Sequence, residues 1–118
     1  MSPPEPPMHA VPSLDIVIVN WNAGDQLQRC LATIPANPDG YALSRVVVVD
    51  NASTDQSLAG LNMPGLPLKV IRNAENRGFG AACNQGAVDS HADYLLFLNP
   101  DTLLERDSAS TVYVARKA

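Results

Sequence analysis

The sequence contains few cysteines, histidines and aromatic residues, and it has neither a long apolar run nor a basic cluster. Its two cysteines, Cys30 and Cys83, lack the spacing of a metal knuckle or a redox pair, so we expect them to be small buried apolar residues. The two histidines have no partner recognisable in the sequence, which argues against a Ser-His-Asp arrangement. No apolar run approaches the length of a bilayer span and the N-terminus lacks a secretory signal, so we predict a cytoplasmic protein with no transmembrane segment.

Charge and length narrow the class of protein further. The 118 residues include 12 acidic and 8 basic side chains, which gives a formal net charge of -4 at pH 7. This balance argues against a nucleic-acid partner. The length suits one domain, large enough for a hydrophobic core but small for a complete α/β enzyme.

Four apolar runs alternate with segments of helical pattern. The apolar runs lie at 14–19, 46–49, 68–71 and 94–98. Helical patterns lie between them, at 25–34 and 78–90 and in a shorter segment after residue 53. Strands that alternate with helices predict an α/β fold with a parallel sheet.

The shortest of the predicted helices depends on a capping box. Ser53 and Gln56 have the three-residue spacing in which a hydroxyl and an amide side chain satisfy each other's backbone donors at a helix start. Leu58 and Leu61 would then form the buried side of that helix. We therefore expect a short helix directly after the second strand.

Polar side chains directly follow three of the four apolar runs. Asp50 comes at the end of the second run, after four consecutive valines. In open α/β sheets ligands bind just outside the carboxyl ends of the strands, so this position favours Asp50 as an acceptor for a ring N–H or a ribose hydroxyl of a nucleotide. The alternative is that Asp50 only begins a turn. For Asp55 the simpler explanation is favoured, namely a negative charge in the first turn of a helix.

Asp101 is the candidate metal ligand. A divalent cation bound to a nucleotide diphosphate needs only one or two protein carboxylates, because phosphates and water fill the other positions. The alternative is a simple turn, since Asn-Pro-Asp-Thr at 99–102 has proline at the second position, where turns favour it.

Gly78 and Gly80 suggest a second class of protein, a dinucleotide-binding oxidoreductase, because Gly-x-Gly opens a helix in that fold. Two features oppose this interpretation. The loop at 73–77 separates the glycines from the preceding strand, and Cys83 stands where the third glycine is expected. Arg77, beside the glycines, is a candidate contact for phosphate, although an exposed loop arginine is commonly only solvated.

Four short motifs occur in a specific order along the chain. They are Val-Asn-Trp-Asn at 19–22, Asp-Asn-Ala-Ser-Thr-Asp at 50–55, Asn-Arg-Gly-Phe-Gly at 76–80 and Asn-Pro-Asp-Thr at 99–102. This order resembles the family 2 glycosyltransferases, most closely the rhamnosyltransferase-like branch, and the resemblance covers 14–104. It implies the N-terminal half of a GT-A fold, a Rossmann-like parallel sheet with flanking helices that binds a nucleotide-sugar donor.

The resemblance also implies the site residues and the reaction. An inverting glycosyltransferase would transfer a sugar from a UDP- or dTDP-linked donor to a glycan or lipid-linked acceptor, with Mg²⁺ or Mn²⁺ as cofactor. Asp101 would hold the metal, and Asn99 stands where the family's Asp-x-Asp motif has its first aspartate. The residues expected to bind the nucleotide sugar are Asn20, Asn22, Asp50, Asn51, Arg77, Gly78, Asn84 and Asn99.

The expected organisation is a proline-rich flexible leader at 1–13, the donor-binding part at 14–104 and an atypical C-terminal tail at 105–118. The catalytic base of the family is a carboxylate in the C-terminal half, which this sequence does not contain. We therefore expect a truncated, frameshifted or split enzyme with little activity alone, or alternatively a non-catalytic binding or interaction module. Association through an exposed sheet edge and a peripheral position at the inner face of the membrane are further expectations.

Overall fold

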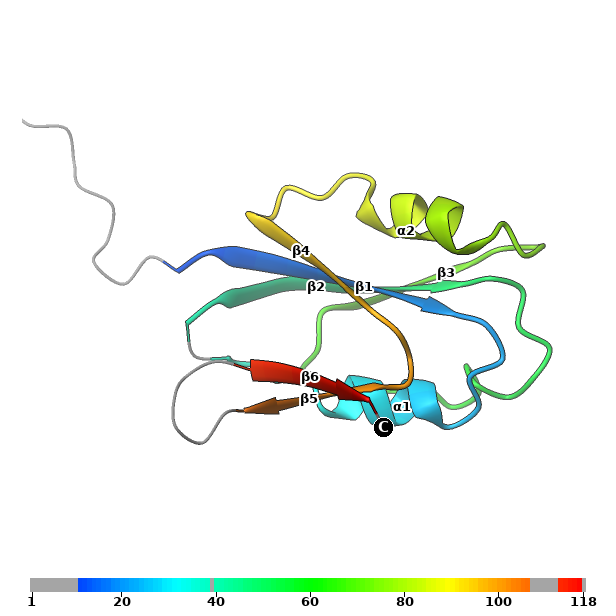
Figure 1. Ribbon diagram of the computed structural model, residues 1–118, viewed down its shortest axis with the longest axis horizontal. Helices are drawn as coiled ribbons and strands as arrows, with labels where there is room; N and C mark the ends of the chain where they lie inside the picture. Colours follow the sequence, from blue (N-terminus) through cyan, green and yellow to red (C-terminus); the bar gives the residue numbers. More distant parts are fainter. Residues whose placement is uncertain (1–10, 39, 107–112, 118) are drawn as a thin grey trace, which may run out of the picture.

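The centre of the protein is a parallel sheet, as the sequence predicts. The computed structural model describes residues 11–38, 40–106 and 113–117. Four parallel strands are arranged in the order β3-β2-β1-β4 (Figure 1). The strands are β1 (Ser13–Asn20), β2 (Ala42–Asp50), β3 (Leu68–Arg72) and β4 (Tyr94–Leu98).

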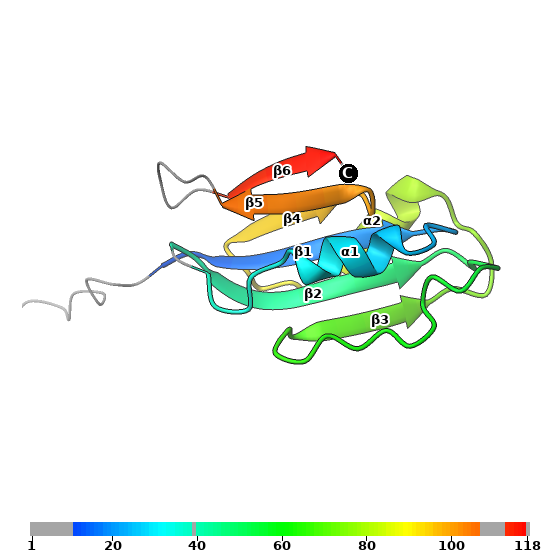
Figure 2. The same cartoon turned by 90° about the horizontal axis from the view of Figure 1, so that it is seen from below.

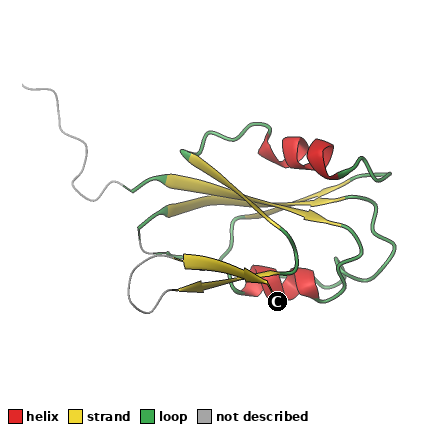
Figure 3. Cartoon of the chain, viewed as in Figure 1, coloured by secondary structure: helices red, strands yellow, loops and turns green. Residues whose placement is uncertain are grey.

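One helix covers each face of this sheet, so the central strands are buried on both sides (Figure 3). The helices are α1 (Gln26–Ala32) and α2 (Phe79–Ala87). Successive side chains of a strand point to opposite faces. Ile16 and Ile18 pack with the buried side of α1, whereas Val17 packs with Ala82 of α2. This double coverage explains why the strands are continuous apolar runs rather than alternating ones.

The helix predicted after Ser53 is absent, and that prediction was wrong. Residues 55–60 form bends and turns, with i to i+3 hydrogen bonds such as Ala59 N–H to the Gln56 carbonyl at 2.9 Å. The Ser53 hydroxyl oxygen does not cap a helix because it accepts from the Asn22 N–H at 2.9 Å and from Asn20 Nδ2 at 3.3 Å, while its proton is donated to Asp50 Oδ1 at 2.6 Å. Leu58 and Leu61 still pack against the core, but only as half-buried side chains.

The C-terminal segment contains more regular structure than its polar sequence indicates. Strands β5 (Thr102–Arg106) and β6 (Tyr113–Lys117) pair antiparallel in a separate two-stranded sheet, and β5 contacts α1 (Figure 2). The tail predicted at 105–118 contains the end of β5 and the whole of β6. Residues 111 and 112, and residues 1–10 of the predicted leader, lie outside the described part of the chain.

One edge of the four-stranded sheet is apolar. β4 has no charged residue, and Tyr94, Leu95 and Phe97 are exposed along it. An uncharged edge strand offers unpaired backbone groups to another chain, so association through this edge remains a prediction. Within the described ranges, neither helix combines the length and apolar character needed to cross a membrane.

Helix α2 lies unusually close to the sheet and is held there at its C-terminal end. A Cβ atom on Gly86 would collide with Val17 Cγ1 and lie 3.0 Å from Val49 Cγ2. Arg45 reaches the same region, because its Nη2 donates to the carbonyls of Gly86 at 3.4 Å and Val88 at 3.3 Å. The Arg45 Nε donates to the buried Asp15 carboxylate at 2.9 Å. The ion pair thus joins β1 to β2, and the other hydrogen bonds of Arg45 join β2 to the end of α2.

We predict that Gly86→Ala lowers the free energy of unfolding by about 1–3 kcal/mol, because the added methyl group overpacks the interface between α2 and the sheet. Urea denaturation measures the change. Gly80→Ala is the matched control, since nothing lies within 4 Å of a Cβ at Gly80 in the same helix. The control should be neutral or stabilising by about 0.5–1 kcal/mol. Equal effects of the two substitutions would contradict this account of the close approach.

Candidate functional site

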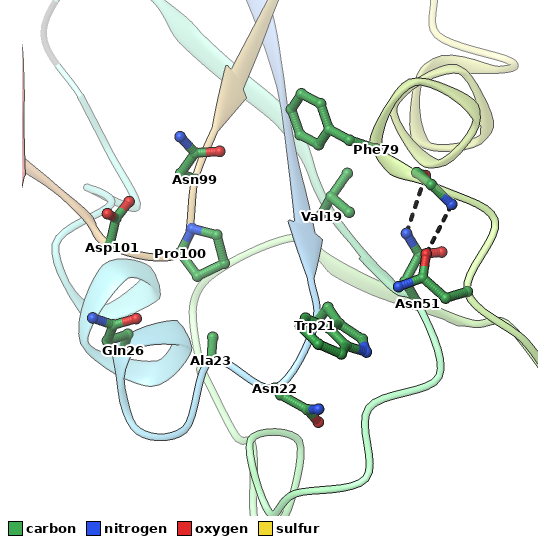
Figure 4. A pocket seen from close by; sticks show the side chains of 12 residues that line it. Val19, Trp21, Asn22, Ala23, Gln26, Asn51, Phe79, Asn99, Pro100 and Asp101 are labelled. Carbon is green, nitrogen blue, oxygen red and sulfur yellow. Dashed lines mark hydrogen bonds between the residues drawn. The ribbon is translucent and has the colours of Figure 1, made fainter.

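A hollow of about 490 Å³ lies at the carboxyl edge of the sheet (Figure 4). It is bounded by the end of β1, the loop before α2 and the turn after β4. Five of the residues predicted to bind a ligand line it. They are Asn22, Asn51, Gly78, Asn99 and Asp101. The fold therefore brings together residues from four separate motifs of the sequence.

A second, smaller hollow of about 210 Å³ contains Asp50 together with Ser53, Asp55 and Arg72. Asp50 and Asn51 are neighbours in the chain but belong to different hollows. The alternation of side chains along a strand explains this separation, because Val48 packs on the α1 face and Val49 on the α2 face. The structure thus does not place Asp50 with Asn22 and Asp101 around one space, and its predicted role toward a nucleotide base remains a prediction.

Asp50 is instead joined to Asn20 by a buried hydrogen bond. The two residues are register partners on β1 and β2, and Asn20 Nδ2 donates to Asp50 Oδ1 at 2.9 Å and to Ser57 Oγ at 2.9 Å. Asp50 Oδ2 accepts from the Ser53 N–H at 3.1 Å. Both carboxylate oxygens of Asp50 are therefore engaged within the protein, as expected for a buried charge. Asn20, fully buried, lines neither hollow.

Asn22 combines exposure to the larger hollow with contacts to a neighbouring loop. Its backbone adopts the left-handed conformation, with φ of 49°, which asparagine tolerates better than most residues. Its Oδ1 accepts from the backbone N–H groups of Thr54 at 2.7 Å and Asp55 at 3.2 Å. The side-chain oxygen of Asn22 therefore fixes the loop after β2, beside the wall of the hollow.

Asn51 links the end of β2 to the loop before α2. Its Nδ2 donates to the Gly78 carbonyl at 3.1 Å, and its Oδ1 accepts from Asn73 Nδ2 at 3.0 Å and from the Arg77 N–H at 3.3 Å. Asn73 and Gln85 exchange two amide hydrogen bonds, at 2.8 Å and 2.7 Å. This chain of amides holds Gly78, whose φ of 84° requires glycine, against the hollow.

Two further predicted residues lie outside both linings. Arg77 is exposed and lines neither hollow, and its backbone N–H donates to Asn51 Oδ1 at 3.3 Å. Asn84 is exposed on α2. Their predicted contacts with a nucleotide sugar remain predictions, and the structure places neither side chain among the residues that line the larger hollow.

Sequence reasoning did not assign Trp21, Gln26 and Phe79 to the site, although all three line the larger hollow. Trp21 is 58% exposed and Phe79 57% exposed, which is high for residues of this size. A usable signal existed for Trp21: it is the single tryptophan and lies in the polar segment at the end of the first strand. Gln26 and Phe79 had no comparable signal.

The turn that carries Asp101 is fixed by α1. The Thr102 N–H donates to the Asn99 carbonyl at 3.0 Å, which confirms the predicted turn, and the Cys30 thiol lies 3.9 Å from the same carbonyl. Thr33 Oγ1 accepts from the Leu104 N–H at 2.9 Å. Asp101 is thereby held at the rim of the hollow, near the N-terminal part of α1 (Figure 4).

Side chains with hard oxygen donors share the lining of the larger hollow with Asp101. Asp101, Asn99 and Gln26 offer carboxylate and amide oxygens, the hard donors that Mg²⁺ and Mn²⁺ prefer. In the part of the chain that the structure describes, no three His, Cys, Asp or Glu residues are grouped so that they alone could hold a metal. The donor set therefore suits a site completed by the ligand's own oxygens.

Two ionisable groups near these loops have shifted pKa values. Burial, and to a smaller extent the negative charge of Asp101, raises the pKa of Cys30 to about 11. The pKa of Asp55 is lowered, first by the hydrogen bond from the Ser57 hydroxyl and then by the backbone N–H of Ser57. Cys30 therefore stays a neutral thiol at physiological pH, whereas Asp55 stays ionised.

We predict that iodoacetamide at neutral pH alkylates Cys83 but not Cys30 in the folded protein. Only the thiolate reacts, and Cys30 is fully buried with a pKa of about 11, whereas Cys83 is half-exposed and its pKa is raised by burial alone. Peptide mass spectrometry with and without urea measures both sites. The Cys83→Ser variant should remain unlabelled until it unfolds, and rapid native labelling of Cys30 would contradict the packing of α1.

Comparison with known proteins agrees with this geometry. The family model described as glycosyl transferase family 2 matches residues 15–113. The succinoglycan biosynthesis protein ExoU of Rhizobium meliloti is 37% identical over 89 residues, which are 73% of this chain and 25% of that protein. An uncharacterized glycosyltransferase of Haemophilus influenzae is 28% identical over 88 residues, which are 75% of this chain and 29% of that protein.

Solved structures show the same fold. The mannosyltransferase PcManGT from Pyrobaculum calidifontis, in complex with GDP-Man and Mn²⁺, superposes with a TM-score of 0.68 at 23% identity, over 80% of this chain and 29% of that one. The chain thus spans less than a third of the length of the proteins it matches. Its sheet and flanking helices are the N-terminal part of a GT-A fold, and the chain belongs to glycosyl transferase family 2.

Proposed function

We propose that this chain is the donor-binding part of an inverting glycosyltransferase that uses a nucleotide-diphosphate sugar. The observation that carries the proposal is the larger hollow, which the exposed aromatic side chains of Trp21 and Phe79 line together with the carboxylate of Asp101. The family 2 match of the chain supports the same conclusion. The solved relatives support it, since one is in complex with GDP-Man and another, S. aureus TarS, with UDP-GlcNAc. The UDP- or dTDP-linked donor and the rhamnosyltransferase-like branch are part of the proposal.

The nucleoside end of the donor would lie against Trp21. Flat bases stack on aromatic side chains, and Trp21 presents an exposed ring to the hollow. Asn51 forms the adjoining wall, and its amide is already committed to Gly78 and Asn73, so it shapes this wall rather than moving with a ligand. Asp50 would affect donor binding only indirectly. Its two oxygens accept hydrogen bonds from Asn20 and Ser53, which adjoin the loop that carries Trp21.

The diphosphate would lie near Asn99 and Asp101, on the other side of the hollow. Asp101 is the one ionisable residue among those that line this hollow, so the described lining supplies no positive charge to a diphosphate. Asp101, Asn99 and Gln26 would hold Mg²⁺ or Mn²⁺, which supplies neutralisation of the charge that develops on the leaving diphosphate. The mannosyltransferase complex with Mn²⁺ supports a divalent cation in this fold.

The acceptor side of the reaction requires a base that takes the proton of an acceptor hydroxyl. No second carboxylate lines the larger hollow within the described residues. This supports the proposal that the described chain binds donor but transfers little sugar alone to a glycan or lipid-linked acceptor. A non-catalytic nucleotide-sugar-binding module remains the second candidate on the same observation. The expected cytoplasmic location, peripheral at the membrane, stays a prediction.

We predict that UDP or dTDP binds in the presence of Mn²⁺ and much more weakly without it. Isothermal titration calorimetry measures both affinities. Trp21→Ala should weaken binding by about 1–3 kcal/mol, the usual contribution of stacking one base on an aromatic side chain. Asp101→Asn should remove most of the gain that Mn²⁺ provides, since the carboxylate is the charged donor of the set.

Tyr94→Ala is the matched control for Trp21→Ala. Tyr94 is 63% exposed, close to the 58% of Trp21. It is the first residue of β4 and therefore lies at the amino end of the strands, whereas the larger hollow lies at their carboxyl end. Its loss should leave the affinity unchanged. Absence of binding to both nucleotides at millimolar concentration with Mn²⁺ would refute the donor-binding proposal, whereas sugar transfer by the purified chain would refute the expected low turnover.

A further inference from the structure

We propose that Asp55 is a positioning residue for the nucleotide-sugar pocket: its carboxylate holds the loop at 21–25 and thereby keeps Trp21 in the wall of the larger hollow. The inference depends on the proposed function, because it assigns the pocket wall to donor binding. Asp55 itself lines the smaller hollow and is not part of the lining of the larger one. Any effect on a ligand must therefore act through other residues.

Trp21 is not held in place by burial. Its side chain is 58% exposed, and the residues from 21 to 25 form no helix or strand. Gly24 within this segment has φ of 60° and nothing within 4 Å of its Cβ position, whereas the neighbouring Ala23 packs half-buried against the core. Ala23 therefore anchors the middle of the segment, and hydrogen bonds to the rest of the protein hold the backbone on either side of it, at Asn22 and Gly24.

Those hydrogen bonds come from the loop after β2. Asp55 Oδ2 accepts from the Gly24 N–H at 2.9 Å. Ser53 Oγ accepts from the Asn22 N–H at 2.9 Å. In return, Asn22 Oδ1 accepts from the N–H groups of Thr54 and Asp55. We call these reciprocal bonds between 21–25 and 53–55 the interloop clamp.

Asp55 is the charged member of the interloop clamp and is itself fixed. Its Oδ1 accepts from the Ser57 N–H at 3.0 Å and from the Ser57 hydroxyl at 2.6 Å. These two bonds orient the carboxylate so that the other oxygen, Oδ2, points at the Gly24 N–H. Hydrogen bonds to an ionised acceptor are stronger than those between neutral groups. Exchange of this carboxylate for an amide should therefore loosen 21–25 more than the loss of a neutral partner would.

The test is Asp55→Asn, which keeps the size of the side chain and removes its charge. NMR amide exchange of Gly24 reports the clamp directly, and fluorescence anisotropy reports Trp21, the single tryptophan of the chain. We expect faster exchange at Gly24, lower anisotropy and UDP affinity in the presence of Mn²⁺ reduced by on the order of tenfold, as for one lost charged hydrogen bond. Asp55→Glu, which keeps the carboxylate, should restore part of the affinity.

Asp25→Asn is the matched control. It removes the same charge from the same segment, but the recorded side-chain partner of Asp25 is Arg29, in an exposed ion pair of 3.1 Å. It should leave the exchange of Gly24, the anisotropy and the UDP affinity unchanged. Urea denaturation of each variant separates a local effect from global unfolding, and Asp55→Glu carries the test if Asp55→Asn fails to fold.

The outcomes separate this inference from the proposed function. A wild-type protein that binds UDP, with Asp55→Asn binding equally well, overturns the positioning role alone. Equal losses in Asp55→Asn and Asp25→Asn also overturn it, since the effect would then be one of general charge. A wild-type protein that binds neither UDP nor dTDP overturns both proposals. A selective loss in Asp55→Asn, with faster exchange at Gly24 and partial rescue by Asp55→Glu, supports the positioning role.

Discussion

The buried hydrogen bond between Asn20 and Asp50 is the constraint on which the carboxyl edge of this sheet depends. It joins β1 and β2 at their last residues and directs both side chains to the face that α1 covers. A carboxylate buried at this depth is stable only with its oxygens engaged, so Ser53 is drawn in as well. Asn51, one residue later, must then face α2, and the edge is divided into two hollows with different chemistry.

Hydrogen bonds that involve polar side chains hold two walls of the larger hollow, in addition to the apolar contact of Ala23 with the core. On one side the amide chain from Asn51 through Asn73 to Gln85 connects β2 to α2. On the other side the interloop clamp connects the ends of β1 and β2. Apolar contact resists sliding poorly because it has no direction, whereas hydrogen bonds fix both distance and angle. Hydrogen bonds can therefore fix Trp21 and Gly78 in position while both stay exposed.

The sequence was sufficient for the sheet and insufficient for the distribution of side chains at its edge. Unbroken runs such as the four valines before Asp50 predicted the parallel strands because nothing but double burial favours them. The prediction of a helix after Ser53 was wrong because the Ser53 hydroxyl oxygen accepts hydrogen bonds from Asn20 and Asn22, at and just after the end of β1 and more than thirty residues away in the sequence. Local patterns contain no information about such partners, and for the same reason they could not separate Asp50 from Asn51.

The exposure of Trp21 and Phe79 also determines which positions of this chain tolerate substitution. Both side chains line the hollow while contributing little to the core, so substitution at either position costs little folding free energy. Asn20 and Asp50 have no such freedom, because each leaves a buried polar partner behind when it changes. Mutation can therefore change the surface of the larger hollow at Trp21 and Phe79 while the stability of the fold preserves Asn20 and Asp50.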